Sequence, residues 1–249
     1  MLVLAIDTAT QVSSVAVASE GRLLSELTMQ GKLTHSETLL PHIEQVLKMA
    51  AVDKSQLTGI VVSNGPGSFT GLRIGLAAAK AMSYVLGIPL VGVSTLQAMA
   101  YQLPVPGVRL MCLLDAQKGN AYVESYKWEN NTLQVVEAVK VAKISDIVAG
   151  CGQLAEQVIL LGDAVQKKIA GKIELPANVS TAMPHLVMPR AACVAMLGQQ
   201  RLLAGDTDNV MDLEPVYIRR SEAEVLWEKR HPEEASVPPC QTRHQITPN

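Results

Sequence analysis

The stretch NGPGSFTGLRIG, residues 64–75, lies between a short apolar run at residues 60–63 and an alanine-rich run at residues 72–86. This order predicts a strand, a glycine-rich turn and a helix. Such a turn lets backbone N–H groups surround an anion at the helix N-terminus. The glycines would also allow close helix packing, because Gly71 and Gly75 lie about one helical turn apart. The Lys-Ser/Thr ending of a Walker loop is missing, and spacing alone leaves both interpretations open.

Three strands are predicted upstream of this stretch. Residues 2–6 and 12–18 are apolar runs separated by a polar turn, which is typical of a hairpin of buried strands. A turn at Gly21 leads into a third strand, expected at residues 23–29. The first sheet therefore begins with antiparallel neighbours.

A helix at residues 39–50 follows, preceded by Thr34 and Glu37 at capping-box spacing. Pro41 predicts either a kink in this helix or a start at Pro41 itself. A buried strand is expected at residues 89–93, with another helix after it. The order β-β-β-α-β-α-β-α predicts an α/β fold with a mixed sheet flanked by helices.

A faint internal repeat indicates a duplication. Two aliphatic residues, an Asp and a polar turn occur at residues 5–8 and again at residues 113–116. The prolines within residues 102–107 would form the linker. We expect an N-terminal domain over residues 1–103 and a C-terminal domain over residues 104–220. The type of the apolar segments at residues 145–151 and 154–161 is left open, a helix at residues 189–203 is expected to pack back on the first domain, and residues 221–249 are expected to form a disordered tail.

Composition excludes several classes of protein. The chain has 249 residues, 48% of them hydrophobic, and 21 Lys and Arg against 23 Asp and Glu give a net charge of −2. A protein that grips a nucleic-acid backbone alone usually has a basic surface. The four cysteines are too far apart for a zinc or redox motif. The uncharged segment at residues 81–108 is broken by Gly and Pro, so we expect no membrane span and a cytoplasmic protein.

Few side chains have the setting of a catalytic or metal-binding group. Asp7 in the first hairpin could position a metal-bound nucleotide phosphate, or bond only to its own turn. His35 and His42 are seven residues apart, which is wider than zinc ligands on one helix, and are expected at the surface or an interface. A Gly-x-Ser-x-Gly elbow is absent. We therefore expect no catalytic residue, no metal and no cofactor.

Six segments of the chain resemble the TsaB (YeaZ) family, the small subunit of the bacterial complex that installs threonylcarbamoyladenosine in tRNA. The resemblance extends from residue 4 to residue 219 and does not cover the tail after Arg220. The matching segments are LAIDTAT (4–10), HSE (35–37), GPGSFTGLRIG (65–75), VGVSTL (91–96), DA (115–116) and EPVYIR (214–219).

The resemblance implies an actin/sugar-kinase/Hsp70-like fold, made of two duplicated ribonuclease-H-like domains. The catalytic relative, TsaD, carries a metal-binding His-x-x-x-His helix, and Thr95 and Met99 stand at the two ligand positions here. Neither is a credible ligand for a hard metal. Ala9 also replaces a glycine that related ATPases place close to a phosphate. This chain is therefore expected to be a degenerate paralogue, with Asp7 and Thr8 as the only residual nucleotide site.

The implied function is a non-catalytic scaffold subunit. It would activate the TsaD-type transferase, which transfers a threonylcarbamoyl group to N6 of adenosine at tRNA position 37, with a TsaE-type ATPase in the same complex. The subunit would contact tRNA only indirectly, although Arg219, Arg220, Lys229 and Arg230 could extend a basic surface. The alternatives are an independent ATP-dependent kinase or carbamoyltransferase of this fold, and a glycoprotease-like peptidase.

A helical face is expected to dock the transferase, or a second copy when the chain is alone. Related heterodimers pack helices of their N-terminal domains together, and small residues on such a face would permit close approach. The expected interface residues are Leu39, Ile43, Leu47, Gly71, Gly75, Ala78 and Met82. The residues of the glycine-rich loop that we single out are Gly65, Pro66, Gly67, Ser68, Phe69, Thr70 and Arg73.

Overall fold

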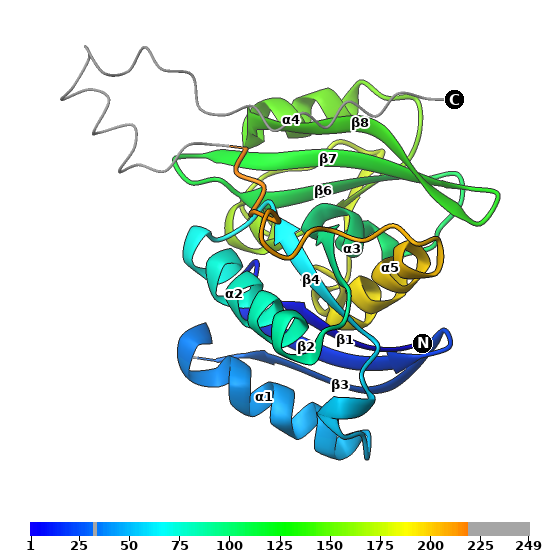
Figure 1. Cartoon of the computed structure of the whole chain (residues 1–249). Coiled ribbons are helices and arrows are strands. Elements are labelled where there is room, and N and C mark those ends of the chain that lie inside the picture. The colour runs from blue at the N-terminus through cyan, green and yellow to red at the C-terminus, as the bar shows by residue number, and fades with distance from the viewer. Residues whose placement is uncertain (32–33, 219–249) are drawn as a thin grey trace, which may run out of the picture. The chain divides into compact units, whose positions relative to one another are not determined.

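The computed structural model describes residues 1–31 and 34–218, and its first half is built on a five-stranded sheet (Figure 1). The first strand of the chain is central in this sheet. It pairs antiparallel with the second strand of the chain on one side and parallel with the fourth on the other, and the third strand pairs with the second at the edge of the sheet. The strand order is β3-β2-β1-β4-β5. The strands are β1 (Leu2–Asp7), β2 (Val12–Ser19), β3 (Arg22–Gln30), β4 (Gly59–Gly65) and β5 (Leu90–Ser94).

The second sheet repeats this topology. Its order is β8-β7-β6-β9-β10, with two antiparallel pairs followed by two parallel pairs, as in the first sheet. This repetition confirms the duplicated actin/sugar-kinase/Hsp70-like fold, while the division of the chain between residues 103 and 104 stays a prediction. The strands are β6 (Arg109–Asp115), β7 (Asn120–Glu129), β8 (Thr132–Lys143), β9 (Val158–Leu161) and β10 (Val179–Thr181).

Helices pack on both faces of the first sheet and on both faces of the second. Alternate residues of β1 separate the two cores: Leu4 faces the core beneath α1 and α2, and Val3 faces the core beneath α5. Helix α5 therefore returns to the first sheet, where the position of a Cβ on Gly198 lies only 2.2 Å from Val61. The helices are α1 (His35–Met49), α2 (Phe69–Leu86), α3 (Thr95–Tyr101), α4 (Ile144–Gly152) and α5 (Ala191–Leu203).

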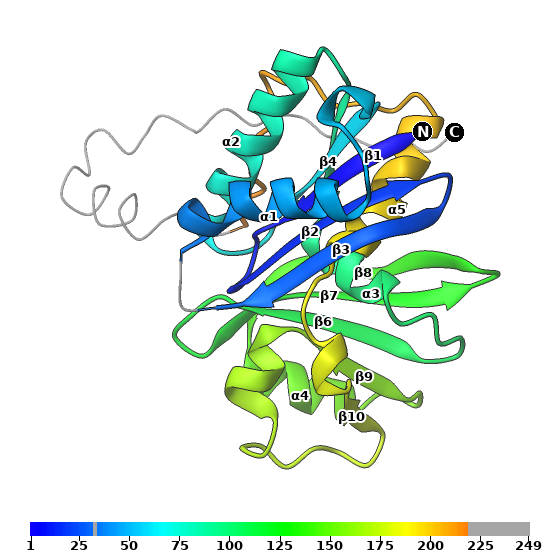
Figure 2. The same cartoon turned by 90° about the horizontal axis from the view of Figure 1, so that it is seen from below.

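The two sheets lie one beyond the other, with α1 and α2 at one end and α4 at the other (Figures 1 and 2). Three short helical turns complete the described elements, at Lys54–Gln56, Val165–Ile169 and Pro184–Leu186. No helix in the described part of the chain combines the length and apolarity needed to cross a bilayer. The predicted disordered tail lies outside the described residues.

The structure decides the two open points about helices. Helix α1 starts at His35 and continues through Pro41, so this proline neither begins nor ends the helix. The backbone N–H of Thr34 donates to Glu37 Oε2 at 2.9 Å, which confirms the predicted capping contact. The apolar segment at residues 145–151 is α4, and the segment at residues 154–161 contains β9.

Candidate functional site

The glycine-rich loop packs directly on the turn of the first hairpin. Ser68 donates its backbone N–H to the carbonyl of Ala9 at 2.7 Å, and Thr8 Oγ1 donates to the carbonyl of Gly71 at 2.7 Å. A Cβ on Gly67 would lie 2.4 Å from the carbonyl oxygen of Ala9, and one on Gly71 would lie 2.1 Å from that of Thr8. These distances are shorter than van der Waals contact, so the glycines serve close packing and the hairpin fills the space beside them.

Asp7 and Thr8, the predicted residual nucleotide site, are both enclosed. Asp7 is fully buried and accepts hydrogen bonds from Ser63 Oγ and, at 3.2 Å, from the backbone N–H of Ala9. Burial raises the pKa of Asp7 to about 6, although both hydrogen bonds favour the charged form. Thr8 is 2% exposed and is bonded to the glycine-rich loop. Neither side chain faces an open cleft, which favours the interpretation that Asp7 ties its own turn and two strands together.

The two histidines of α1 also contact this hairpin. His35 Nε2 lies 2.7 Å from the carbonyl oxygen of Thr10, and His42 Nδ1 lies 3.0 Å from Ser13 Oγ. Burial lowers the pKa of His42. The expectation that both are surface or interface histidines is therefore wrong for His42, which is buried because it bonds a serine of β2.

Thr95 and Met99, predicted from the resemblance to stand at the two ligand positions of TsaD, lie in an apolar junction between α3 and the second sheet. Both are fully buried, and the hydroxyl of Thr95 has no hydrogen-bond partner among the described residues. Met99 Cε lies 2.9 Å from the position of a Cβ on Gly162, which follows β9. The junction contains Leu96, Met99, Ala100, Leu110, Cys112, Leu114, Tyr126 and Leu161. Apolar side chains and a thioether occupy this place, and neither suits a hard metal ion.

The structure corrects the predicted docking stripe. Leu39, Ile43, Gly71 and Gly75 are buried in the core of this chain, because the apolar stripe of each helix faces its own sheet. A Cβ on Gly75 would lie 2.3 Å from Thr8 Oγ1, so a larger residue there would disturb the fold before it disturbed a partner. The other three residues, Leu47, Ala78 and Met82, are half-buried against the same core.

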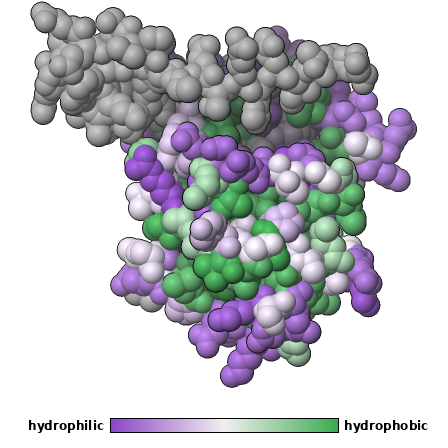
Figure 3. Space-filling model, in the orientation of Figure 1, coloured by the Kyte–Doolittle hydropathy of each residue, from purple (hydrophilic) through white to green (hydrophobic). Residues whose placement is uncertain are grey.

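A different set of apolar side chains faces outward from α1 and α2. Tyr84 is 71% exposed and Val85 is 79% exposed on α2, and Leu40 and Met49 are exposed on α1. Apolar residues gather over α2 in the space-filling view (Figure 3). These side chains are exposed, whereas Leu39, Ile43, Gly71 and Gly75 of the predicted stripe are buried; an interface at the half-buried Leu47, Ala78 and Met82 stays a prediction.

A C-terminal segment that sequence reasoning missed connects these elements. Residues 206–218, here called the strap, run along β5 and α2 to the glycine-rich loop. Asp208 accepts from the backbone N–H of Gly92 at 2.7 Å and bonds Arg201, which also bonds Asp206. Val216 donates its backbone N–H to the carbonyl of Asn64 at 2.7 Å.

The strap ends in an exposed cluster of two aromatic rings and an arginine. Tyr217 and Phe69 have ring centroids 5.0 Å apart, and the Arg73 guanidinium lies 3.8 Å from the centroid of the Phe69 ring. Arg73 Nε donates to the Tyr217 hydroxyl at 2.8 Å. The segments EPVYIR and GPGSFTGLRIG were each noticed in the sequence, but no sequence pattern pairs residues 144 positions apart.

Comparisons with known proteins agree with this geometry. The sequence model of the family described as TsaD, tRNA N6-adenosine threonylcarbamoyltransferase, matches residues 29–227. The tRNA threonylcarbamoyladenosine biosynthesis protein TsaB of Buchnera aphidicola is 32% identical over 173 residues, which are 67% of this chain and 80% of that protein. This chain belongs to the TsaB family. TsaB of Bacillus subtilis is 29% identical over 91% of this chain and 98% of its own length.

A solved structure of the same family shows the same fold. YeaZ from Pseudomonas aeruginosa superposes with a TM-score of 0.71 at 23% identity, covering 87% of this chain and 99% of its own. TsaB of Escherichia coli is 28% identical over 92% of this chain and 98% of its own length. The TsaB relationship therefore includes both sheets and the strap.

Proposed function

We propose that this chain is a cytoplasmic, non-catalytic subunit in the biosynthesis of threonylcarbamoyladenosine in tRNA. The names of its TsaB relatives support the pathway. The observation that carries the non-catalytic role is the buried Met99, which packs toward Gly162 where a TsaD-type protein would hold a metal ligand. Asp7 and Thr8 support the same conclusion, since their side chains are bonded within the protein.

The partner in this proposal is a TsaD-type transferase of the same fold, with a TsaE-type ATPase in the same complex. The neighbouring side chains of Tyr84 and Val85 support a docking role for α2, because they leave apolar surface in contact with water. Leu40 and Met49 expose further apolar groups on α1. A second copy of the chain would occupy this surface when the transferase is absent.

Contact with tRNA is indirect in this proposal. A net charge of −2 provides no excess of cations to neutralise phosphates. The subunit would act on the modification by holding the transferase in its active form. The four basic residues singled out near the C-terminus, from Arg219 onward, lie outside the described part of the chain.

The test is a reconstitution with purified components. Threonylcarbamoyladenosine formation and ATP hydrolysis are measured for this chain alone, for the transferase with the ATPase, and for all three together. We expect neither product from the chain alone and modification only from the complete mixture. Turnover of either substrate by the chain alone, removed by Asp7→Ala, would instead support an independent ATP-dependent enzyme.

A further inference from the structure

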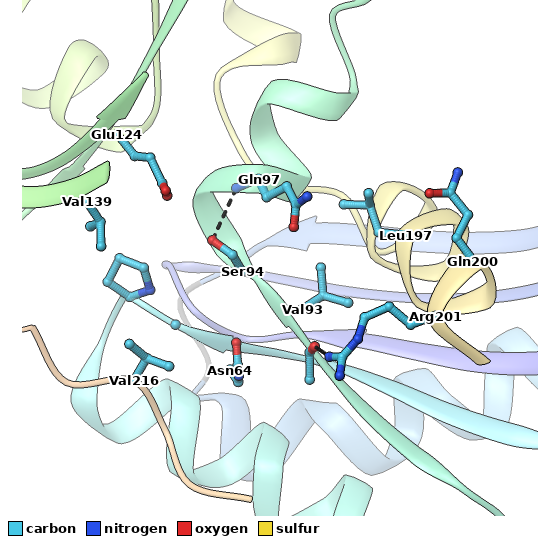
Figure 4. Close-up of a pocket in the computed structure, with 13 residues that line it drawn as sticks. Asn64, Val93, Ser94, Gln97, Glu124, Val139, Leu197, Gln200, Arg201 and Val216 are labelled. Atoms are coloured by element: carbon cyan, nitrogen blue, oxygen red, sulfur yellow. Dashed lines mark hydrogen bonds between the residues drawn. The ribbon is translucent and has the colours of Figure 1, made fainter. Parts of the chain in front are cut away.

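A cavity lined by both polar and apolar side chains lies beside α3. Gln97 lines it, and residues two positions apart on a helix point about 200° apart, so Gln97 faces away from Thr95 and Met99. The cavity has a volume of about 410 Å³, within the range of small-molecule sites. Its walls come from β4, β5, the β7–β8 hairpin, α5 and the strap, and Figure 4 shows these side chains around one open space.

Glu124 supplies a carboxylate to this cavity. It is half-buried on β7, and its Oε2 accepts a hydrogen bond from the Tyr126 hydroxyl at 2.5 Å. No described Lys, Arg or His lies within ion-pair distance of Glu124. Burial raises the pKa of Glu124, as expected for a carboxylate without a counter-charge. A cation entering the cavity would provide the missing partner.

The remaining polar groups favour a cation with a hydrogen-bonding body over an anion. Arg201 lines the far end, but Asp206, Asp208 and the carbonyl of Gly92 already bind its guanidinium. The side-chain amides of Asn64 and Gln97 make no hydrogen bond within the described residues and remain free for a ligand. Glu124 is the one carboxylate among the described residues that line the cavity, and the aspartates bound to Arg201 offset the charge of its guanidinium. The lining therefore favours a cation over phosphates and other anions.

We propose that this cavity binds a small aliphatic ammonium compound, with its charged nitrogen at Glu124 and its polar groups at the amides of Asn64 and Gln97. The methyl groups of Val139 and Val216 would contact the methylene groups of the ligand. The site adjoins the junction at Met99, because Val139 packs against that junction and Tyr126, which belongs to it, bonds Glu124. Its lining residues do not include Met99 or any residue of α1 or α2, so the proposal does not depend on the proposed function.

Binding is tested on the full chain with three probes of matched length: putrescine, 1,4-butanediol and succinate. Chemical shifts of labelled valine methyl groups report which probe enters the cavity. We expect saturable shifts at Val139 and Val216 with putrescine, at concentrations up to about 10 mM. No such response is expected from the neutral diol or the dianion. The proposal is overturned if putrescine gives no response or if the diol binds equally well.

Three variants separate this site from non-specific attraction. Glu124→Gln removes the charge and should weaken putrescine binding by about tenfold or more. Glu129→Gln, at the exposed end of the same strand, should leave binding unchanged. Val139→Phe should block the cavity while Glu124 stays in place, which keeps the test decisive if Glu124→Gln does not fold. Equal affinity of the wild type and both cavity variants would show that the amine binds elsewhere.

Discussion

The carboxyl group of Asp7 is enclosed by the two strands and the turn that it connects. Its pKa of about 6 in the folded chain lies above the ordinary value of 3.8, because burial disfavours the charged form more than Ser63 and Ala9 stabilise it. The folded chain therefore binds this proton more tightly than the unfolded chain does. The stabilisation from protonated Asp7 is complete below pH 3.8 and is lost as the pH rises to about 6.

Asp7→Asn should remove this pH dependence, since an amide can occupy the same place without titrating. The free energy of unfolding of the wild type, minus that of Asp7→Asn, should fall by about 2 kcal/mol between pH 4 and pH 7. Urea unfolding of both proteins across this pH range measures this difference. The contributions of the other carboxyl groups to the pH dependence cancel, because both proteins contain them. A difference that stays constant, or rises with pH, would contradict the buried ionisation described here.

Gly71 should tolerate no side chain, because a Cβ would lie 2.1 Å from the carbonyl oxygen of Thr8. We expect Gly71→Ala to lower the free energy of unfolding by about 1–3 kcal/mol through overpacking. Gly150→Ala on α4 is the matched control, since nothing lies within 4 Å of its Cβ position. Denaturant unfolding should show the control unchanged or slightly more stable. Equal effects at both positions would mean that the loop relaxes away from the hairpin.

At the scale of elements, the sequence predicted best where burial is continuous or a cap precedes a helix. The apolar run at residues 2–6 predicted β1. The capping pair Thr34 and Glu37 indicated a helix, although Pro41 left open where it starts. Strand β8 is exposed along most of both faces, so its residues carry no burial period, and its length was not predicted.

The docking stripe was placed wrongly for a related reason. Gly75 lies on the apolar stripe of α2 and Ile43 on that of α1, but the first sheet of the same chain covers both stripes. Periodicity identifies which face of a helix is apolar, not whether its own chain or a partner covers that face. The contact of Arg73 with Tyr217 depends on the path of the strap, which no local pattern determines.

The outward face of α2 is expected to contact the transferase, and a charge placed there tests this. Val85→Glu places a charge on a residue that is 79% exposed, so the isolated chain should fold normally, while docking of the transferase should weaken by about tenfold or more. Leu203→Glu is the control, since Leu203 is 74% exposed on α5. Sizing chromatography and titration calorimetry measure the association. Equal binding by Val85→Glu and wild type would exclude this part of α2 from the interface.

The strap depends on Arg201, which bonds both Asp206 and Asp208. Arg201→Met should release the strap, and the amides of Asp208 and Val216 should exchange with solvent faster while β1 and β4 stay protected. Arg22→Met, at an exposed position on β3, should change neither amide. Hydrogen exchange measures both variants. Lys80 Nζ also donates to the carbonyls of Met211 and Leu213 in the strap. Unchanged protection of Val216 in Arg201→Met would show that Lys80 and Asn64 hold the strap without the arginine.

At the scale of the whole molecule, two copies of one sheet topology meet through an apolar junction around Met99. Met99, Leu114 and Leu161 belong to a packed core at this junction. A cavity of about 410 Å³ lies beside it, lined by residues of both sheets.

The most direct test is the rate of threonylcarbamoyladenosine formation as this chain is titrated into fixed amounts of the transferase and the ATPase. We expect wild type and Asp7→Asn to reach the same plateau rate, because the carboxyl group of Asp7 takes no part in the reaction. Val85→Glu should approach that plateau only at higher concentrations, since it weakens docking alone. A folded Asp7→Asn protein that binds the transferase with normal affinity but gives a plateau about tenfold lower or less would contradict the account, because this chain would then take part in the chemistry.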